Sequence, residues 1–363
     1  MLARLWMAAL LAGASLSAAL LLAGGAHGTP RARAAATAPQ CSRTQQLAYV
    51  AAKFRGERGM VWLAAATGGG RRRLFRAATP ELSPDGSMVA VTDFGHSAGL
   101  GIFSVCGGRV GEYFSAHDGI GGIVWSPDSS LVAAVIDPHP NGSAFGQRLV
   151  VIDVATGQVT TVATGFLNGW GGPTFSPTPP YQIAYDIVPR SNADPNVWSA
   201  AIGQPGVQLT HGGSNEFPLW GPQGILYEHL LSSGEPELEL LSGGQSTKLM
   251  RLLGWPVALS SDGLHLAAEG AACGVVWPLS VNLATRKVVR QFANGFAPFG
   301  ISPSGSALLI AGSPPSGECG GKRSVIETVP FSGGRPTKIA YGTSPSWADS
   351  AAVGTQASAP IVP

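Results

Sequence analysis

One short phrase recurs along the chain: a large apolar residue, a tight Ser-Pro-Asp-Gly-like turn and a run of apolar residues. It reads LSPDGSMVAVTD from Leu82 and VWSPDSSLVAAVID from Val124. Divergent or truncated copies begin near Thr174, Leu219, Ala258, Gly300 and Pro345. The spacing of roughly 39 to 50 residues is long enough for four short strands and their turns. The repeat therefore predicts a row of similar units rather than one irregular fold.

Each copy favours a strand, a turn and a second strand. In Ser83–Gly86 the proline presets φ at the second turn position, and Gly86 can adopt the left-handed conformation. Two further strands follow before the next copy, with GG, TG and PG pairs between them. One unit cannot bury both faces of its sheet, so neighbouring units must stack. The pattern predicts an all-β fold, a seven-bladed β-propeller of four-stranded antiparallel blades.

The two ends of the repeated region complement each other. Residues 47–52, 60–65 and 72–76 predict strands two, three and four of a unit that has no first strand. Residues 346–348 predict a first strand with nothing after it. Joining them gives a first and last blade split between the termini and leaves no long unpaired sheet edge. The propeller is expected over residues 46–349.

The repeated phrase and a fourth strand that ends in Leu209–Thr210 resemble the TolB-like (WD-repeat-like) β-propeller repeat family. The resemblance covers about Leu47–Ala348. The same repeat is found in the propellers of prolyl-oligopeptidase-type proteases, so the resemblance implies the fold. The similarity to TolB implies a scaffold in the cell envelope. The count of seven copies, against six blades in TolB, predicts a member of the wider family and not TolB itself.

The segments outside the repeat have a different composition. Residues 1–26, with Arg4 before an apolar run, predict a signal peptide, and an uncleaved N-terminal anchor is the alternative. Residues 27–45 are expected to be a linker and residues 350–363 a flexible tail. The protein is thus predicted to be exported, either periplasmic or extracellular at the cell envelope. A net charge of +2 gives no argument for a nucleic-acid partner.

Three tempting motifs have ordinary explanations. Gly95–Gly99 reads GHSAG, but a strand follows it, so a hairpin loop is favoured over a nucleophile elbow. The turn residues Asp85, Asp128 and Asp262 are replaced by other residues in other copies, so turn chemistry explains them better than a metal site. Arg71–Arg73 is expected to lie on a solvated hairpin face. No metal or cofactor is predicted.

The loops that join a fourth strand to the next first strand carry the candidate binding residues. These loops approach the central axis of a propeller, where converging polar and aromatic groups are typical of ligand sites. The candidates are His117, Asp118, Asn168, Trp170, His211, Asn215, Glu216 and Trp255. Packing between blades is the alternative explanation. The opposite face, with Gln223, is expected to be neutral to binding.

Four cysteines in an exported chain favour disulfides. Cys106 is expected in a turn between strands three and four, and Cys41 just before a second strand, on the same face. Cys273 and Cys319 fall in loops between strands two and three, on the opposite face. This parity predicts Cys41–Cys106 and Cys273–Cys319, with four free thiols as the alternative.

The sequence favours a non-catalytic, monomeric binding or scaffold module for a protein, peptide or glycan partner in the cell envelope. A propeller enzyme, a hydrolase or lyase, is the first alternative, with His117, His211 and Glu216 as acid–base candidates. A sugar-binding module is the second, with Trp170 and Trp255 as stacking platforms.

Overall fold

The computed structural model describes residues 47–51, 58–94, 98–115, 117–138, 146–167, 172–188, 193–252, 254–272, 275–292, 294–302, 304–312 and 324–348. The chain divides into two units, Met1–Ala34 and Ala35–Pro363, and every described residue belongs to the second. Within the described part, the secondary structure is β-strand, and no helix could cross a membrane.

The strands pair with their chain neighbours in antiparallel meanders, which confirms the predicted all-β class. One sheet has the order β27-β1-β2-β3-β4-β5-β6: β1 (Leu47–Ala51), β2 (Gly59–Ala64), β3 (Arg72–Leu82), β4 (Met88–Phe94), β5 (Ala98–Ser104), β6 (Arg109–Tyr113) and β27 (Thr343–Trp347). A second has the order β14-β13-β12-β10-β9-β8-β7, with β11 paired to β12: β7 (Gly119–Trp125), β8 (Leu131–Asp137), β9 (Gln147–Asp153), β10 (Val159–Leu167), β11 (Thr174–Phe175), β12 (Gln182–Val188), β13 (Asn196–Ala201) and β14 (Val207–Gln208).

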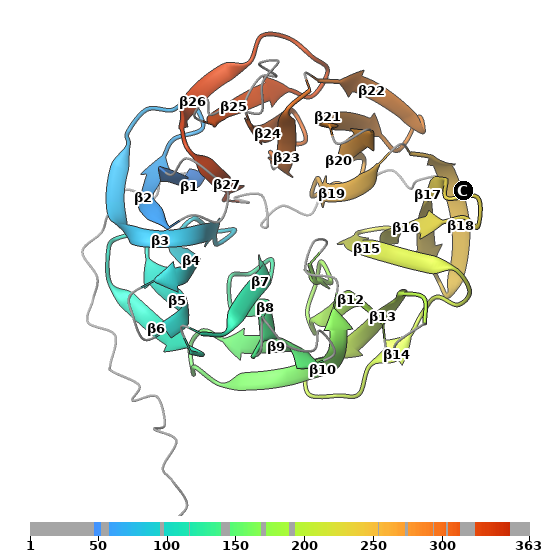
Figure 1. Cartoon of the computed structure of the whole chain (residues 1–363), viewed down its shortest axis with the longest axis horizontal. Helices are drawn as coiled ribbons and strands as arrows, with labels where there is room; N and C mark the ends of the chain where they lie inside the picture. Colours follow the sequence, from blue (N-terminus) through green and yellow to red (C-terminus); the bar gives the residue numbers. More distant parts are fainter. Residues whose placement is uncertain are drawn as a thin grey trace, which may run out of the picture. The chain divides into compact units, whose positions relative to one another are not determined.

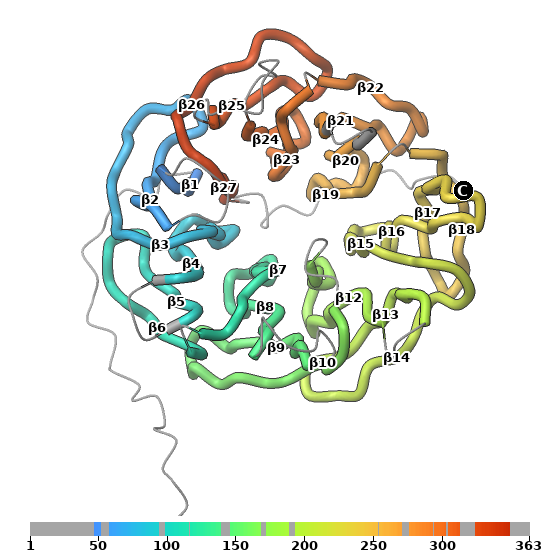
Figure 2. The backbone as a smooth tube through the Cα atoms, viewed as in Figure 1, coloured from blue at the N-terminus to red at the C-terminus, as the bar shows by residue number. Residues whose placement is uncertain are grey.

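Three further sheets have four strands each. They are β15 (Ser214–Gly221), β16 (Gly224–Leu230), β17 (Pro236–Ser242) and β18 (Gln245–Arg251); β19 (Trp255–Leu259), β20 (His265–Ala272), β21 (Val275–Asn282) and β22 (Lys287–Gln291); and β23 (Phe296–Ile301), β24 (Ala307–Gly312), β25 (Val325–Pro330) and β26 (Thr337–Tyr341). Figure 1 shows the meanders following one another around a ring, with β7, β15, β19 and β23 toward its middle. The tube in Figure 2 follows the same path from blue to red.

The last described strand pairs with the first. β27 runs antiparallel to β1, with Leu47 opposite Trp347 and Ala48 opposite Ser346. Ser346 also accepts a hydrogen bond, through its Oγ, from the backbone N–H of Leu82 at 2.8 Å. The predicted pairing of the two ends of the repeat is therefore confirmed, and β27 contacts the sheets on both sides of it.

The long strand β3 belongs to two meanders. Its first half pairs with β2 and its second half with β4, and the register shifts between Ala78 and Glu81. Thr79, inside this bulge, has a φ of 39°. Residues with positive φ also lie three positions before Trp125, Phe175, Trp220 and Trp347: Gly122, Gly172, Phe217 and Ser344. Register shifts also occur where β7, β15, β19 and β23 pair with the strand that follows each of them. A bulge of this kind bends a strand and raises its twist.

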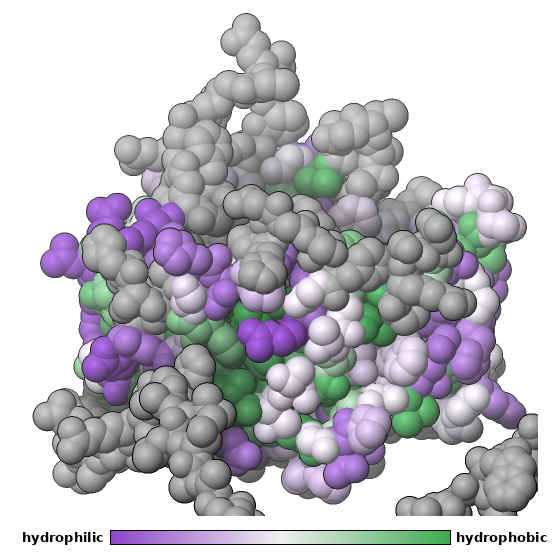
Figure 3. Space-filling view, turned by 60° about the horizontal axis from the view of Figure 1, so that its bottom comes forward, coloured by the Kyte–Doolittle hydropathy of each residue, from purple (hydrophilic) through white to green (hydrophobic). Residues whose placement is uncertain are grey.

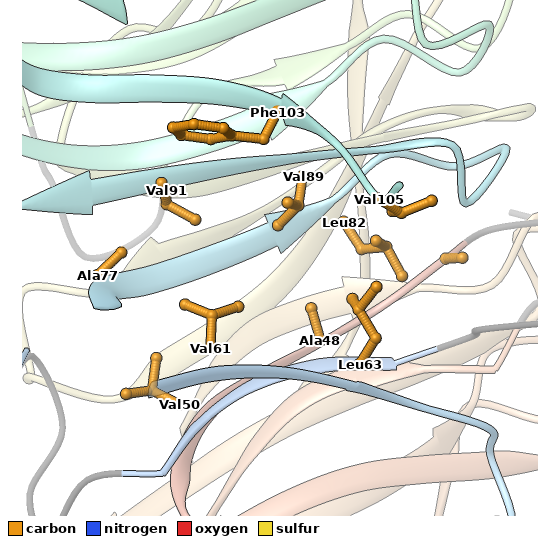
Figure 4. Close-up of a cluster of buried hydrophobic side chains, with 11 residues drawn as sticks. Ala48, Val50, Val61, Leu63, Ala77, Leu82, Val89, Val91, Phe103 and Val105 are labelled. Carbon is orange, nitrogen blue, oxygen red and sulfur yellow. The ribbon is translucent and has the colours of Figure 1, made fainter. Parts of the chain in front are cut away.

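The hydrophobic core lies between neighbouring meanders rather than in one central mass. In Figure 4, Val50 and Val61 of β1 and β2 face Val89 and Val91 of β4, and all four are essentially inaccessible to solvent. Similar apolar clusters lie between the other neighbouring meanders. The alternation of apolar residues therefore stabilises the ring by burying both faces of each sheet.

The turn chemistry expected from the sequence is present. Ser83 Oγ donates to Asp85 Oδ1 at 2.7 Å, and Asp85 Oδ1 accepts the backbone N–H of Ser87 at 3.0 Å. Although burial acts to raise it, these bonds leave the pKa of Asp85 below its usual value. Asp128 and Asp262 make the same turn contacts. The described residues hold no cluster of His, Cys, Asp and Glu side chains suited to a metal.

Large exposed apolar side chains are few and dispersed over different strands. They include Val110, Val207 and Tyr341, the last with Lys338 Nζ 3.4 Å from its ring centroid. Figure 3 shows hydrophilic and hydrophobic residues interspersed over one side of the molecule. Binding sites must therefore be sought in the hollows and loops of the ring.

Candidate binding site

A groove of about 960 Å³ lies between the meander β11–β14 and the meander β15–β18. It opens at the end of the sheets where strand one turns into strand two and strand three into strand four, which we call the turn face. The groove is lined by Ser176, Pro177, Thr178, Pro179, Pro180, Gln182, Ser199, Leu209, Trp220, Gly221, Pro222, Gln223, Gly224, Ile225, Leu241, Ser242, Gly243 and Gly244. Its volume is near the upper end of the usual range for ligand pockets.

The groove occurs where neighbouring turns do not meet. Elsewhere on the turn face, Ser129 Oγ accepts the Asp85 N–H at 3.2 Å, and Gln223 Nε2 donates to the Asp262 carbonyl at 3.1 Å. Among the described residues, no hydrogen bond joins the turn at 176–181 to the turn at 221–224. The second turn is short, because Gly221 pairs directly with Gly224. A shorter hairpin leaves the adjoining turn without a neighbour.

The apolar packing beneath the groove is also sparse. The cluster between these two meanders contains Ala184, Val197, Ile225, Tyr227 and Leu241, and it is the smallest of the clusters between meanders. Trp220 is half-buried and packs against this cluster. The described structure contains no hydrogen bond from its indole N–H, so the Trp220 side chain is anchored by packing and its N–H is free to bind a ligand.

The polar groups of the groove are neutral. None of its lining side chains carries a formal charge. The Ser199 hydroxyl, on a residue only 8% exposed, and the Gln182 side-chain amide make no hydrogen bond in the described structure. The groove can therefore hold an uncharged ligand by stacking and hydrogen bonding, but its lining offers no carboxylate, imidazole or thiol for acid–base or nucleophilic chemistry.

Those sequence-predicted residues that the structure describes lie at the other end of the sheets. His117 and Asp118 follow β6, where Asp118 Oδ2 accepts the Ser115 N–H at 2.8 Å and the His117 side chain is exposed. His211 is exposed in the β14–β15 connection. Asn168 and Trp170 lie outside the described residues. Partner binding by these residues stays a prediction.

Asn215 is part of a buried hydrogen-bond network. It is 2% exposed, its Nδ2 donates to Asn196 Oδ1 at 3.0 Å, and its Oδ1 lies 2.8 Å from His229 Nδ1. Thr210 Oγ1 donates to the same Asn196 oxygen at 3.2 Å. Because both ends of the amide have partners inside the protein, the geometry gives Asn215 a role in joining β13 to β15 and β16.

Glu216 lies directly opposite Glu228 in the β15–β16 pair. Ser214 Oγ donates to Glu216 Oε1 at 2.5 Å, whereas Glu228 Oε2 is buried without a hydrogen-bond partner. Burial, and then the charge of Glu216, raise the pKa of Glu228 to about 7. Two carboxylates in one cross-strand pair repel when both are ionised.

We expect Glu216→Gln to stabilise the protein at pH 8.5 by roughly 0.5 to 1 kcal/mol, the usual size of a cross-strand charge effect. At pH 5.5 the gain should vanish, because Glu228 is then protonated and uncharged. Urea unfolding at both pH values measures the difference. The exposed Glu112→Gln serves as the matched control; an equal gain at both pH values would contradict repulsion as the cause.

Trp255 contacts Phe217, which lies in the bulge of the neighbouring strand β15. Its ring stacks on Phe217, with centroids 6.0 Å apart and planes inclined by 20°. The Phe217 N–H donates in turn to Asp186 Oδ2 at 2.9 Å. Packing between blades, the alternative weighed from the sequence, accounts for this contact of Trp255.

The structure also shows where two other sequence motifs lie, GHSAG and Arg71–Arg73. GHSAG falls between the strands β4 and β5, as a hairpin loop requires, and its residues 95–97 lie outside the described part. Arg71 and Arg73 are exposed, as expected for a solvated hairpin face, whereas Arg72 is half-buried. Arg71 donates to the Ile339 carbonyl and Arg72 to the Val105 carbonyl, so they tie β3 to the meanders on either side.

Cys106 lies in the β5–β6 turn, as predicted, and is disulfide-bonded. Cys41, Cys273 and Cys319 lie outside the described residues. The pairing Cys41–Cys106 and Cys273–Cys319 stays a prediction, and we expect non-reducing peptide mapping of the protein to recover these two linked pairs. A peptide linking Cys41 to Cys319 would contradict the parity argument.

Sequence reasoning missed the groove because it treated the turn face as uniform. Gln223, taken as a neutral position, lines the groove. The available signal was the sequence GPQG at 221–224, which departs from the SPDG pattern and shortens one turn of the ring.

No family model and no curated protein matches the chain. Solved structures do match it. TolB from Acinetobacter baumannii has a TM-score of 0.52 at 17% identity, over 84% of this chain and 66% of that chain. The chain has a TolB-like β-propeller fold. The propeller thus spans just under two thirds of that TolB.

Enzymes share the fold. A puromycin-hydrolysing peptidase of Mycobacterium tuberculosis has a TM-score of 0.58 at 17% identity, over 82% of the propeller chain and 53% of that chain. An oligogalacturonate lyase in complex with manganese has a TM-score of 0.55 at 14% identity, over 74% of the propeller chain and 87% of that chain. At such identities the likeness concerns the fold alone, and function must be argued from the site.

Proposed function

We propose that this chain is an exported, non-catalytic, seven-bladed propeller that binds a protein partner in the cell envelope and acts as a scaffold. The turn-face groove is the observation that carries the proposal. It combines a half-buried tryptophan, prolines and unpaired neutral polar groups, which is the composition of a recognition site rather than of a reaction centre.

The blade count is supported by the inner strands. β27, β3, β7, β11, β15, β19 and β23 each contact the next, and β23 contacts β27 again. Counting one blade for each inner strand gives seven. The envelope location is supported by the sequence of residues 1–26, which resembles an export signal.

Site-specific crosslinking tests the binding role. Gln223 in the groove, or Ala155 in the exposed β9–β10 turn, is replaced by a photo-crosslinking amino acid in the full chain. Irradiation of cells should give a discrete crosslinked protein from position 223 and none from position 155. Trp220→Phe in the same chain should reduce the yield. Crosslinks from both positions, or from neither, would contradict a specific site in the groove.

The opposite face is tested by the same assay. If the loops predicted from the sequence also bind, a crosslinker at His211 should capture a partner, and Glu216→Ala should weaken that capture by ~1–3 kcal/mol, as for anchor residues. Capture from position 223 and none from position 211 would confine binding to the groove.

A further inference from the structure

We infer that the turn-face groove recognises an extended, uncharged peptide segment that contains proline. This inference rests on the proposed function, which gives the groove a protein partner, and it specifies the part of that partner that enters. The argument uses three properties of the lining: its charge, its aromatic residue and its hydrogen-bonding groups.

The charge of the lining excludes ionic recognition. None of the side chains around the groove is acidic or basic. A charged residue of the ligand would lose its hydration on entry without gaining a counter-charge, which is costly. An uncharged segment does not lose this energy, so the neutral lining complements a neutral ligand.

Trp220 supplies the flat apolar surface that a proline ring requires. The side chain is half-buried and packs against the apolar cluster between the two meanders, which restricts its motion. Grooves lined by aromatic residues bind polyproline II segments, because these are already extended and lose little conformational entropy on docking. Pro179 and Pro180, on the facing turn, give the opposite wall a stiff apolar surface.

The free polar groups of the groove include donors that suit such a segment. The indole N–H of Trp220, the amide of Gln182 and the hydroxyl of Ser199 have no partner in the described structure. A polyproline II segment has no internal hydrogen bonds, and each proline lacks an N–H, so the ligand presents mainly carbonyl acceptors. Donors in the wall and acceptors in the ligand match.

Calorimetry on the full chain tests the inference with a blocked nine-residue peptide of alternating proline and alanine. We expect saturable binding of this probe. Blocked glycine–serine peptide of the same length, and the proline peptide with two lysines, should bind at least about tenfold more weakly, since about 1.4 kcal/mol of lost stacking or added desolvation gives that factor.

Three variants locate the binding. Trp220→Phe keeps a ring in the core but removes the indole donor, and Ser242→Lys places a charge at the exposed rim. Each should weaken the proline probe about tenfold. Ala155→Lys, on the equivalent turn of another meander, should leave affinity within about twofold. If Trp220→Phe disturbs folding, as judged by its thermal unfolding, the rim variant alone still decides the location.

Several outcomes would overturn the inference. If the glycine–serine peptide bound as tightly as the proline probe, proline would not be recognised. If the lysine peptide did so, the groove would not select an uncharged ligand. Binding of a neutral glucose oligosaccharide in place of the peptide would make the groove a sugar site. No binding of the proline probe, together with a crosslinked partner at position 223, would refute the proline segment and leave the proposed function standing. Absence of both would refute both.

Discussion

Removing residues 342–363 should destabilise the protein severely, whereas removing residues 350–363 should have little effect. The longer deletion eliminates β27, which pairs with β1 and lies against β3 and β23. It exposes the edge of β1 and the apolar side chains of Leu47 and Tyr49, which are now 1% and 3% exposed. The loss in the free energy of unfolding should exceed about 4 kcal/mol, beyond most single substitutions.

Soluble yield and the midpoint of thermal unfolding compare the two deletions. An unpaired edge beside an apolar face also favours aggregation, so the longer deletion should accumulate in the insoluble fraction. Equal solubility and equal thermal midpoints of the two deletion variants would show that β27 does not close the ring.

Replacing Glu81 by glutamine should abolish a large loss of stability between pH 5 and pH 8. Glu81 lies on β3 beside the bulge, and its carboxyl group has no hydrogen bond or ion pair in the described structure. The side chain keeps some accessible surface, but the protein surrounds its carboxyl group, and burial raises the pKa to about 8. A buried carboxyl without a partner is held protonated until this pH.

The direction of the pH effect follows from proton binding. Above the ordinary pKa of 4.5 the unfolded chain releases the Glu81 proton, while the folded protein retains it up to about pH 8. The unfolded state therefore binds fewer protons, and stability falls as pH rises through this window. At pH 9 the Glu81→Gln variant should be more stable than the parent by about 5 kcal/mol, from 1.36 kcal/mol for each pKa unit between 4.5 and about 8.

Urea unfolding at pH 4.5 and pH 9 measures this effect. Glu112→Gln is the matched control, because Glu112 forms a surface ion pair with Arg109 and should change stability by less than about 1 kcal/mol at either pH. A parent protein whose stability does not fall between these pH values would contradict the raised pKa of Glu81.

The repeat made the fold predictable because each copy carries the same turn residues and the same alternation of apolar residues. Turn residues such as Asp85 and Gly86 fix the hairpin, alternating apolar residues fix which faces are buried, and the incomplete units at the two ends imply their partnership. The predicted pairing of residues 346–348 with residues 47–52 required no information beyond these patterns. Because the same signals recur in every copy, each copy supports the fold predicted from the others.

The candidate site was less predictable because it depends on a mismatch between neighbours. The groove exists where the turn at 221–224 is shorter than the one beside it, and a hollow of this kind is a property of two hairpins rather than of one. Trp220 looked like the other large residues that end the first strands, such as Trp125. Only its packing and its free indole N–H distinguish it.

The pairing of β1 with β27 also sets an order of events for a chain synthesised from its N-terminus. β1, β2 and the first half of β3 emerge early, but the strand that pairs with β1 is the last of the described strands to appear. During synthesis the edge of β1 stays open while the intervening meanders emerge. Contacts between residues so far apart in sequence form slowly, so closure of the ring should be a late step in folding, after Trp347 has left the ribosome.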